Sequence, residues 1–246
     1  MTKLSVNVNK VALLRNARAG QVPSVVRAAE MALNSGAAGV TVHPRPDERH
    51  IHRTDCDDLA ALLDQTPYRR FEFNIEGNPF VGDYLAIIRS LRPTQCTLVP
   101  DDPGALTSDH GWNIEAERGR LQPLIAELRE LGCRVSLFMD PVPAMIEMVP
   151  ATGADRIELY TESYAKAYEQ SGDVLKDVFD RFAEAARTAG QLGLGVNAGH
   201  DLSLSNLGRF VTIPGILEVS IGHALIADAL EMGIANAVKA YLALLK

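Results

Sequence analysis

Eight short runs rich in β-branched and aromatic residues alternate with longer helix-compatible segments along the sequence. No linker or low-complexity stretch interrupts this alternation. Repetition of strand and helix implies parallel strands that are joined by crossover helices. The predicted strands cover residues 4–8, 39–43, 71–75, 96–99, 134–139, 156–160, 194–199 and 217–222.

The segments between the strands support this interpretation. Segments 23–36, 121–132 and 178–193 have apolar residues at three- and four-residue spacing, and each ends in glycine. Eight right-handed crossovers close naturally into a barrel, and 246 residues fit one barrel domain. We therefore predict an α/β fold, a single-domain (β/α)8 TIM barrel over residues 1–246, with an open doubly wound sheet as the alternative.

Charge and cysteine content narrow the class of protein. The formal net charge of -7 leaves no basic excess for a nucleic-acid backbone, so any anionic ligand must be held by local groups. The opening MTKLSVNV has no apolar signal core, and the late apolar stretch 224–245 is interrupted by charges, so we expect a cytoplasmic protein without membrane contact. Cys56, Cys96 and Cys133 lack metal-site spacing, which predicts buried, reduced thiols.

Polar and ionisable residues recur where the predicted strands end. In a barrel these ends converge on the face that carries active sites. A single Asn, Asp or His there could equally cap a turn or pack in the core, but a ring of titratable groups costs desolvation and mutual repulsion and so indicates function. The ring comprises Asn7, Asn9, His43, Arg45, Glu76, Asp101, Asp140, Glu158, His200, Gly222 and His223.

Two segments have the chemistry of anion sites. Segment 43–53, HPRPDERHIHR, concentrates histidine and arginine, and Arg45 offers a planar fork suited to phosphate or carboxylate. Gly222 stands directly before a predicted helix, whose first backbone N–H groups can bind phosphate. A solvated charge run and an unliganded helix start are the alternatives.

The loops after the first, fourth and sixth strands look longer than is usual for strand-to-helix connections. The loop at 100–115 is polar and carries the sole tryptophan, Trp112. It is predicted to be either an active-site lid or a solvated excursion. Signatures of zinc proteases, P-loop enzymes, dinucleotide-binding folds and serine hydrolases are absent from the sequence.

Taken in order, VNVNKVALLRNAR, GVTVHPRPDERHI, FNIEG, LVPD, RVSLFMD, RIELYT, GVNAGHDL and SIGHALI resemble the successive motifs of the pyridoxine 5'-phosphate synthase family, over residues 4–230. The resemblance implies a barrel with extra helices. It implies a vitamin B6 biosynthetic transferase that condenses 3-amino-2-oxopropyl phosphate with 1-deoxy-D-xylulose 5-phosphate to give pyridoxine 5'-phosphate, phosphate and water. It also implies no metal, no cofactor and a cytoplasmic homo-octamer.

The resemblance assigns roles residue by residue. His43 and Glu76 match proton acceptors, His200 a proton donor, and Glu158 a group that stabilises a transition state. The remaining matches form two phosphate-substrate sites. The amino-ketone site comprises Asn7, Arg18, the position of Asp201, Gly222 and His223, and the sugar site comprises Arg45, His50 and Thr107. We expect Asn9 and Lys10 to bind substrate beside the sugar site.

The chain departs from the family pattern in two places. Many members have Asp-His where this chain has Asn9-Lys10, and glycine where it has Asp201. The first change touches the expected sugar-phosphate contacts, and we interpret it as a subtype. Two other functions stay open: a metal-dependent sugar-phosphate isomerase or aldolase that uses His43, Glu76, Glu158 and His200 as ligands, and a non-catalytic phosphometabolite-binding barrel.

Overall fold

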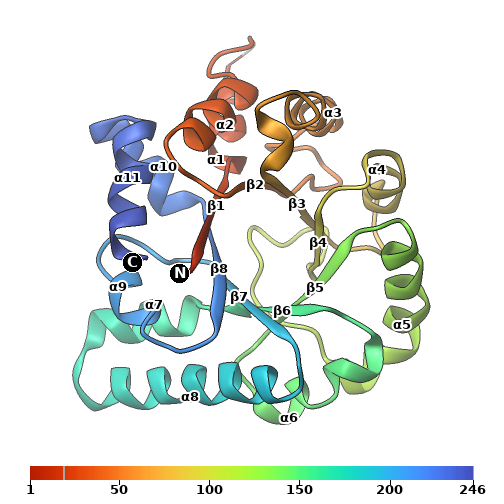
Figure 1. The fold of residues 1–246 in the computed structure, drawn as a ribbon, viewed down its shortest axis with the longest axis vertical. Helices are drawn as coiled ribbons and strands as arrows, with labels where there is room; N and C mark the ends of the chain where they lie inside the picture. The colour runs from red at the N-terminus through yellow and green to blue at the C-terminus, as the bar shows by residue number, and fades with distance from the viewer. Residues whose placement is uncertain (19, 246) are drawn as a thin grey trace.

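The computed structural model describes residues 1–18 and 20–245. Within them, eight parallel strands pair in chain order, and β1 closes the barrel by pairing with β8 (Figure 1). The predicted closed barrel is therefore confirmed, and its strands begin and end within two residues of the predicted positions. The strands are β1 (Lys3–Asn7), β2 (Gly39–Val42), β3 (Glu72–Gly77), β4 (Gln95–Leu98), β5 (Arg134–Met139), β6 (Arg156–Tyr160), β7 (Gly195–Gly199) and β8 (Ile216–Ile221).

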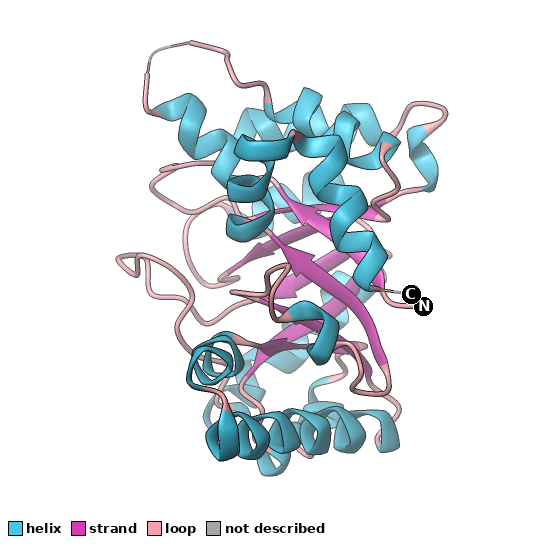
Figure 2. Cartoon of the chain, turned by 90° about the vertical axis from the view of Figure 1, so that its left-hand side faces the viewer, coloured by secondary structure: helices cyan, strands magenta, loops and turns pink. Residues whose placement is uncertain are grey.

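Helices surround the barrel (Figures 1 and 2). They are α1 (Asn9–Asn16), α2 (Val25–Asn34), α3 (Arg53–Leu63), α4 (Tyr84–Leu91), α5 (Ile114–Glu130), α6 (Pro143–Ile146), α7 (Glu162–Gln170), α8 (Gly172–Gln191), α9 (Leu207–Phe210), α10 (His223–Met232) and α11 (Ile234–Leu244), with short 3₁₀ turns at Tyr68–Arg70 and Val149–Thr152.

Extra helices replace two of the predicted long loops. Helix α1 begins two residues after β1, and α7 begins two residues after β6, so the expectation of long loops there was wrong. The connection from β4 to α5 is long as predicted, and we call residues 99–113 the β4–α5 segment.

Alternation along the strands separates two environments. Leu4 and Val6 point outward into the apolar layer between strands and helices, while Ser5 points inward. Many small barrels fill their interior with branched apolar residues, but here the middle layer is polar and internally hydrogen-bonded. Ser5 contacts Thr41 at 2.7 Å between hydroxyl oxygens, and the hydroxyl of Thr97 donates to Asn74 at 3.1 Å.

Charged side chains close the end of the barrel at which the strands begin. The ammonium of Lys3 lies 2.6 Å from Glu72, and Arg134 pairs with the other oxygen of the same carboxylate. Arg134 also donates to Gln95 at 2.8 Å. These charged and polar side chains at the start of the strands therefore pair with one another.

The burial of the cysteines agrees with the expectation from the sequence. Cys56, Cys96 and Cys133 are buried free thiols. Along the stretches 1–18 and 20–245, no helix has the length and apolar character needed to cross a bilayer.

Candidate active site

A cavity of about 500 Å³ opens where the strands end. All but three of the site residues predicted from the sequence line it. Those residues are Asn7, Asn9, Lys10, His43, Arg45, His50, Glu76, Thr107, Glu158, His200, Asp201, Gly222 and His223. Barrel geometry explains this convergence, because parallel strands deliver their C-terminal ends to one face.

Three other residues named from the sequence lie elsewhere. Arg18 is exposed beyond the end of α1 and does not line the cavity. Asp140 turns toward the β4–α5 segment, where its carboxylate accepts from the backbone N–H of Gly111 at 3.0 Å. Asp101 is buried beneath that segment, beside the cavity wall.

Asparagines after β1 hold the neighbouring strand ends together. The side-chain oxygen of Asn7 accepts from the N–H of Asn9 at 3.0 Å, and that of Asn9 accepts from the N–H of His43 at 2.9 Å. The amide of Asn7 also donates to Glu76 at 3.5 Å. These contacts fix the spacing between the two candidate bases, His43 and Glu76.

The pKa values of His43 and Glu76 are both shifted in the direction that favours the neutral form. Nδ1 of His43 lies 3.8 Å from Oε2 of Glu76. Burial, reinforced by Arg45, holds the pKa of His43 well below its usual range, so the imidazole is neutral near pH 7. Burial and the charge of Glu158 raise the pKa of Glu76 well above its ordinary value, which makes its carboxylate a stronger base.

Glu158 lies deeper than the strand-end position expected from the sequence. It is in the middle of β6, its residue is 3% exposed, and Oε2 accepts from Thr97 at 3.4 Å. A Cβ on Gly199 would lie 2.2 Å from Oε1, so glycine in β7 makes room for this carboxyl group. Burial, followed by the charge of Glu218, raises the pKa of Glu158 to about 8. Near pH 7 it is therefore a hydrogen-bond donor.

Basic groups gather on the side of β1 and β2. Arg45 is 5% exposed and Lys10 is partly buried. Burial, then the charges of Arg45 and Lys10, lower the pKa of His50 to about 4. A neutral imidazole beside two permanent cations leaves this part of the cavity suited to a phosphate group.

His200 and Asp201 follow β7 in left-handed backbone, with φ of 84° and 59°. Nδ1 of His200 lies 2.8 Å from Asp201, and Nε2 lies 2.8 Å from the hydroxyl of Thr107. The ring of Tyr160 meets that of His200 edge to face, with 4.9 Å between centroids. Both imidazole nitrogens are thus engaged, and Thr107 brings the β4–α5 segment over the cavity.

Helix α10 begins at His223, immediately after Gly222. A Cβ on Gly222 would come within 3.2 Å of three side-chain atoms of Asn7, so a side chain here would crowd the cavity wall. The first-turn N–H groups of this ten-residue helix have no partners within the helix, which is the condition under which a helix start can bind phosphate.

The β4–α5 segment is anchored near its C-terminal end and in its middle. Trp112 is buried, and its indole N–H donates to the carbonyl of Leu98 at 2.8 Å. Arg49 donates to the carbonyls of Ala105 at 2.9 Å and Pro103 at 3.2 Å. The segment is therefore fastened across the cavity and is not a free excursion.

The acidic and imidazole groups do not form a metal centre. Over residues 1–18 and 20–245, no three His, Cys, Asp or Glu side chains come together in a way that could hold a metal ion. His43 pairs with Glu76, whereas His200 pairs with Asp201. The ligand set required by the isomerase or aldolase alternative is thus not assembled.

Comparison with known proteins identifies the family. The family described as "Pyridoxal phosphate biosynthesis protein PdxJ" matches residues 4–246. A "Pyridoxine 5'-phosphate synthase" of Albidiferax ferrireducens is 55% identical, over 98% of this chain and 96% of the relative. The chain belongs to the pyridoxine 5'-phosphate synthase family. Another protein of that name, from Christiangramia forsetii, is 49% identical over the full length of both chains.

Solved structures with low identity agree on the fold of this pyridoxine 5'-phosphate synthase family member. The 3-hexulose-6-phosphate synthase of Salmonella typhimurium superposes with a TM-score of 0.65 at 13% identity, covering 99% of this chain and 98% of the other. A thiamine phosphate pyrophosphorylase from Pyrococcus furiosus gives 0.59 at 13% identity, covering 99% and 95%. At this identity the likeness concerns the barrel alone.

Several cavity residues of this family member were not singled out from the sequence. Ser108 faces the cavity through the folding of the β4–α5 segment, Arg49 reaches it from the connection between β2 and α3, and Phe138 reaches it from β5. Glu162 lines it as the first residue of α7. The signal for Phe138 was available, since it has the inward parity of Arg134 and Ser136 in its strand.

Proposed function

We propose that this chain condenses 3-amino-2-oxopropyl phosphate with 1-deoxy-D-xylulose 5-phosphate, giving pyridoxine 5'-phosphate, inorganic phosphate and water. One observation carries the proposal. A single cavity is lined by Arg45, by the start of α10 and by acid and base side chains, and we assign Arg45 and the helix start to the phosphate groups of the two substrates. Family membership supports the same reaction.

The two phosphorylated substrates have distinct places in this proposal. The amino ketone binds with its phosphate at Gly222 and His223, within reach of Asn7 and the N–H of Asp201. The sugar phosphate binds near Arg45, His50 and Thr107, with Asn9 and Lys10 beside it. Arg18 is exposed and does not line the cavity. To bind the phosphate of the amino ketone, its side chain would have to extend into the cavity from outside.

Forming an aromatic ring from two ketones requires imine formation, enolisation, loss of phosphate and loss of water, and each step moves a proton. His43 is neutral near pH 7 and accepts protons without first having to lose one. Glu76 is a strengthened base when ionised. His200 gives a proton to a leaving group, such as phosphate or water.

Glu158 stabilises charge in this scheme. A carboxyl group with a pKa of about 8 is protonated near neutral pH and can donate a hydrogen bond to a developing oxyanion. Its burial at the bottom of the cavity removes competing water, which strengthens that interaction.

The assembly and the cellular place of the enzyme complete the proposal. We infer a cytoplasmic homo-octamer, as the family resemblance implies. Exposed apolar side chains support self-association, because Leu14, Val22 and Leu230 line a second, largely apolar cavity formed by α1, α2 and α10. Light scattering on the purified protein measures the number of subunits.

The deciding experiment mixes the two substrates with purified protein and follows pyridoxine 5'-phosphate and free phosphate. We expect both products in equal amounts, with activity retained after treatment with a chelator. Binding of the substrates without turnover would assign the chain to the non-catalytic alternative. If a chelator abolished the activity and a divalent metal ion restored it, the metal-dependent alternative would be supported instead.

A further inference from the structure

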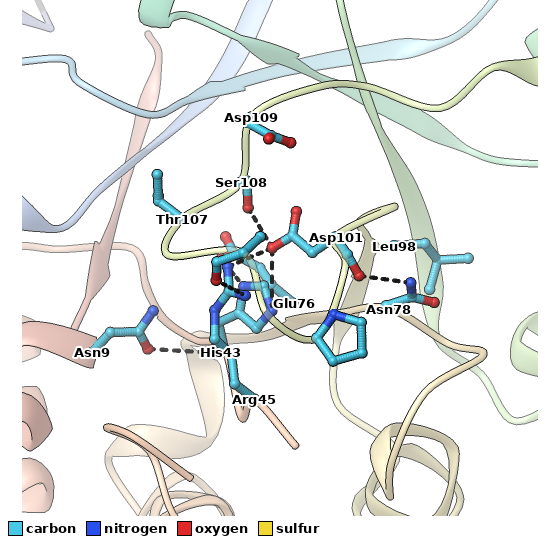
Figure 3. A network of polar contacts seen from close by, with 12 residues as sticks. Asn9, His43, Arg45, Glu76, Asn78, Leu98, Asp101, Thr107, Ser108 and Asp109 are labelled. Atoms are coloured by element: carbon cyan, nitrogen blue, oxygen red, sulfur yellow. Dashed lines mark hydrogen bonds and ion pairs between the residues drawn. The ribbon is translucent and has the colours of Figure 1, made fainter. Parts of the chain in front are cut away.

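Asp101 lies at the base of the β4–α5 segment, and its residue is 3% exposed. Figure 3 shows its carboxylate at the centre of a polar network. Oδ2 accepts from Nη2 of Arg45 at 2.5 Å and from the hydroxyl of Ser108 at 2.8 Å. The same oxygen lies 3.9 Å from Nε2 of His43. One oxygen atom thus links an anion-binding arginine, a lid residue and a candidate base.

The cost of this arrangement argues against a role in turn formation alone. Oδ1 of Asp101 is buried and has no hydrogen-bond partner among residues 1–18 and 20–245. An unsatisfied buried carboxylate oxygen is expensive, and burial raises the pKa of Asp101 although Arg45 opposes the shift. The backbone carbonyl of Asp101, which accepts from Asn78 at 2.9 Å, already holds the turn.

Arg45 joins the two ends of this network. Nη2 contacts Asp101 at the base of the β4–α5 segment, and Nη1 donates to the carbonyl of Ala105 nearer its tip at 3.0 Å. Ser108 docks on the same carboxylate, and its neighbour Thr107 contacts His200 on the far side of the cavity. The guanidinium can therefore hold this orientation only while the segment is closed.

We propose that Asp101 is a positioning residue that couples closure of the β4–α5 segment to recognition of the sugar phosphate by Arg45. This inference rests on the proposed function and deepens it. When Ser108 docks, the shared carboxylate holds the fork of Arg45 in place, and its remaining N–H donors are available to the phosphate. When the segment opens, Arg45 loses Ala105 and its orientation relaxes.

Asp101 also lies beside His43. Oδ2 of Asp101 is 3.9 Å from Nε2 of His43, and Oε2 of Glu76 is 3.8 Å from Nδ1, so a carboxyl group faces each imidazole nitrogen. Lid closure, anion binding and a candidate base thus meet at one carboxylate.

The test compares Asp101→Asn, Ser108→Ala and the double variant. Asparagine keeps the shape but removes the negative charge, so the hydrogen bonds from Arg45 and Ser108 lose their charge-assisted strength. We expect the KM for 1-deoxy-D-xylulose 5-phosphate to rise about 10- to 100-fold in Asp101→Asn, while the KM for the amino ketone stays within about twofold. Ser108→Ala has a smaller effect of the same kind, and it adds little in the Asp101→Asn background because both act on one contact.

Asp140→Ala is the matched control. Asp140 anchors the same segment through Gly111 but contacts neither Arg45 nor His43. We expect this variant to change the use of both substrates alike. Equal changes for both substrates in Asp101→Asn, or additive effects of Asp101→Asn and Ser108→Ala, would overturn the proposal.

A second measurement separates this inference from the proposed reaction. Trp112 is the sole tryptophan and lies in the β4–α5 segment, so its fluorescence reports on the segment as 1-deoxy-D-xylulose 5-phosphate is added without the second substrate. We expect a saturable change in the wild type that needs about 10-fold more sugar phosphate in Ser108→Ala. This readout requires no turnover and stays decisive if Asp101→Asn fails to fold. An unchanged midpoint in Ser108→Ala would count against the coupling even in an active enzyme.

Discussion

Nδ1 of His200 lies 2.8 Å from the carboxylate of Asp201, although the two residues are consecutive and both have left-handed backbone. This backbone turns the two side chains toward each other across the exit of β7. His200 lowers the pKa of Asp201, so the acid is ionised and holds the imidazole by its Nδ1–H. Nε2 is then the nitrogen that faces Thr107 and the cavity.

Replacing Asp201 distinguishes the role of its backbone N–H from the role of its carboxylate. Asp201→Gly retains the N–H proposed to bind phosphate and relieves the left-handed conformation, so we expect the unfolding free energy to stay within about 1 kcal/mol. Turnover falls about tenfold because His200 loses its partner, and Asp201→Asn restores part of it. A large rise in the KM for the amino ketone in Asp201→Gly would show instead that the carboxylate contacts the ligand.

Glu76→Gln and His200→Asn test the acid and base assignments. Each should lower turnover by at least about 100-fold, as expected when a proton-transfer group is lost. Both changes preserve shape, and asparagine tolerates the left-handed backbone at position 200 better than most residues. Thermal unfolding should show intact folds, and near-normal turnover in either variant would remove that residue from the mechanism.

The pH profile tests Glu158. Because its pKa is about 8, it is protonated near neutral pH and loses its donor as the pH rises through that value. We expect turnover to fall on this alkaline side. Glu158→Gln keeps an N–H donor that does not titrate, so the alkaline limb should disappear while the rate at neutral pH stays within about tenfold.

Stability provides an independent check on the same group. A carboxyl group whose pKa is higher in the folded than in the unfolded state contributes stability that is fully present below its unfolded pKa. That contribution is lost as the pH rises through the folded pKa of about 8. Denaturant unfolding at several pH values should show this loss in the wild type and a weaker one in Glu158→Gln. Identical pH dependence would contradict the raised pKa.

Gly222 is predicted to be indispensable for the amino-ketone site. A methyl group there would press on the side chain of Asn7, and valine would add bulk in the approach path of the phosphate. Gly222→Val should weaken the binding of inorganic phosphate and of the amino ketone by at least about tenfold, with less change for the sugar phosphate. Gly119→Ala is the control, since its Cβ would meet open space in α5. A liganded structure with phosphate elsewhere and this turn empty would refute the assignment.

Sequence pattern alone predicted the barrel because each strand and helix is encoded locally. Helices α1 and α7 were not predicted from the sequence, because both are short and polar and resemble loops. The depth of Glu158 follows from strand register, which sequence spacing does not fix. Ser108 and Asp101 come into contact only because the β4–α5 segment folds back on its own base, which the sequence does not reveal. Arg18 was predicted from a motif match, but the fold does not place it in the cavity.

We predict that Lys10 contacts the sugar phosphate. It is the second residue of α1 and lines the cavity beside His50. Lys10→Ala should raise the KM for 1-deoxy-D-xylulose 5-phosphate about tenfold and leave that for the amino ketone within about twofold, because a charge-assisted hydrogen bond is lost. The exposed Lys176→Ala is the control.

The same substitution should also be visible at His50. Burial and Arg45 are the larger causes of its low pKa of about 4, and the charge of Lys10 adds to them. Removing that charge must therefore raise the pKa of His50, which a histidine NMR titration of wild type and Lys10→Ala measures. Borohydride with substrate should trap no adduct on Lys10, since the amino ketone supplies the imine nitrogen. Unchanged kinetics for both substrates together with an unchanged His50 titration would return Lys10 to the role of a surface charge.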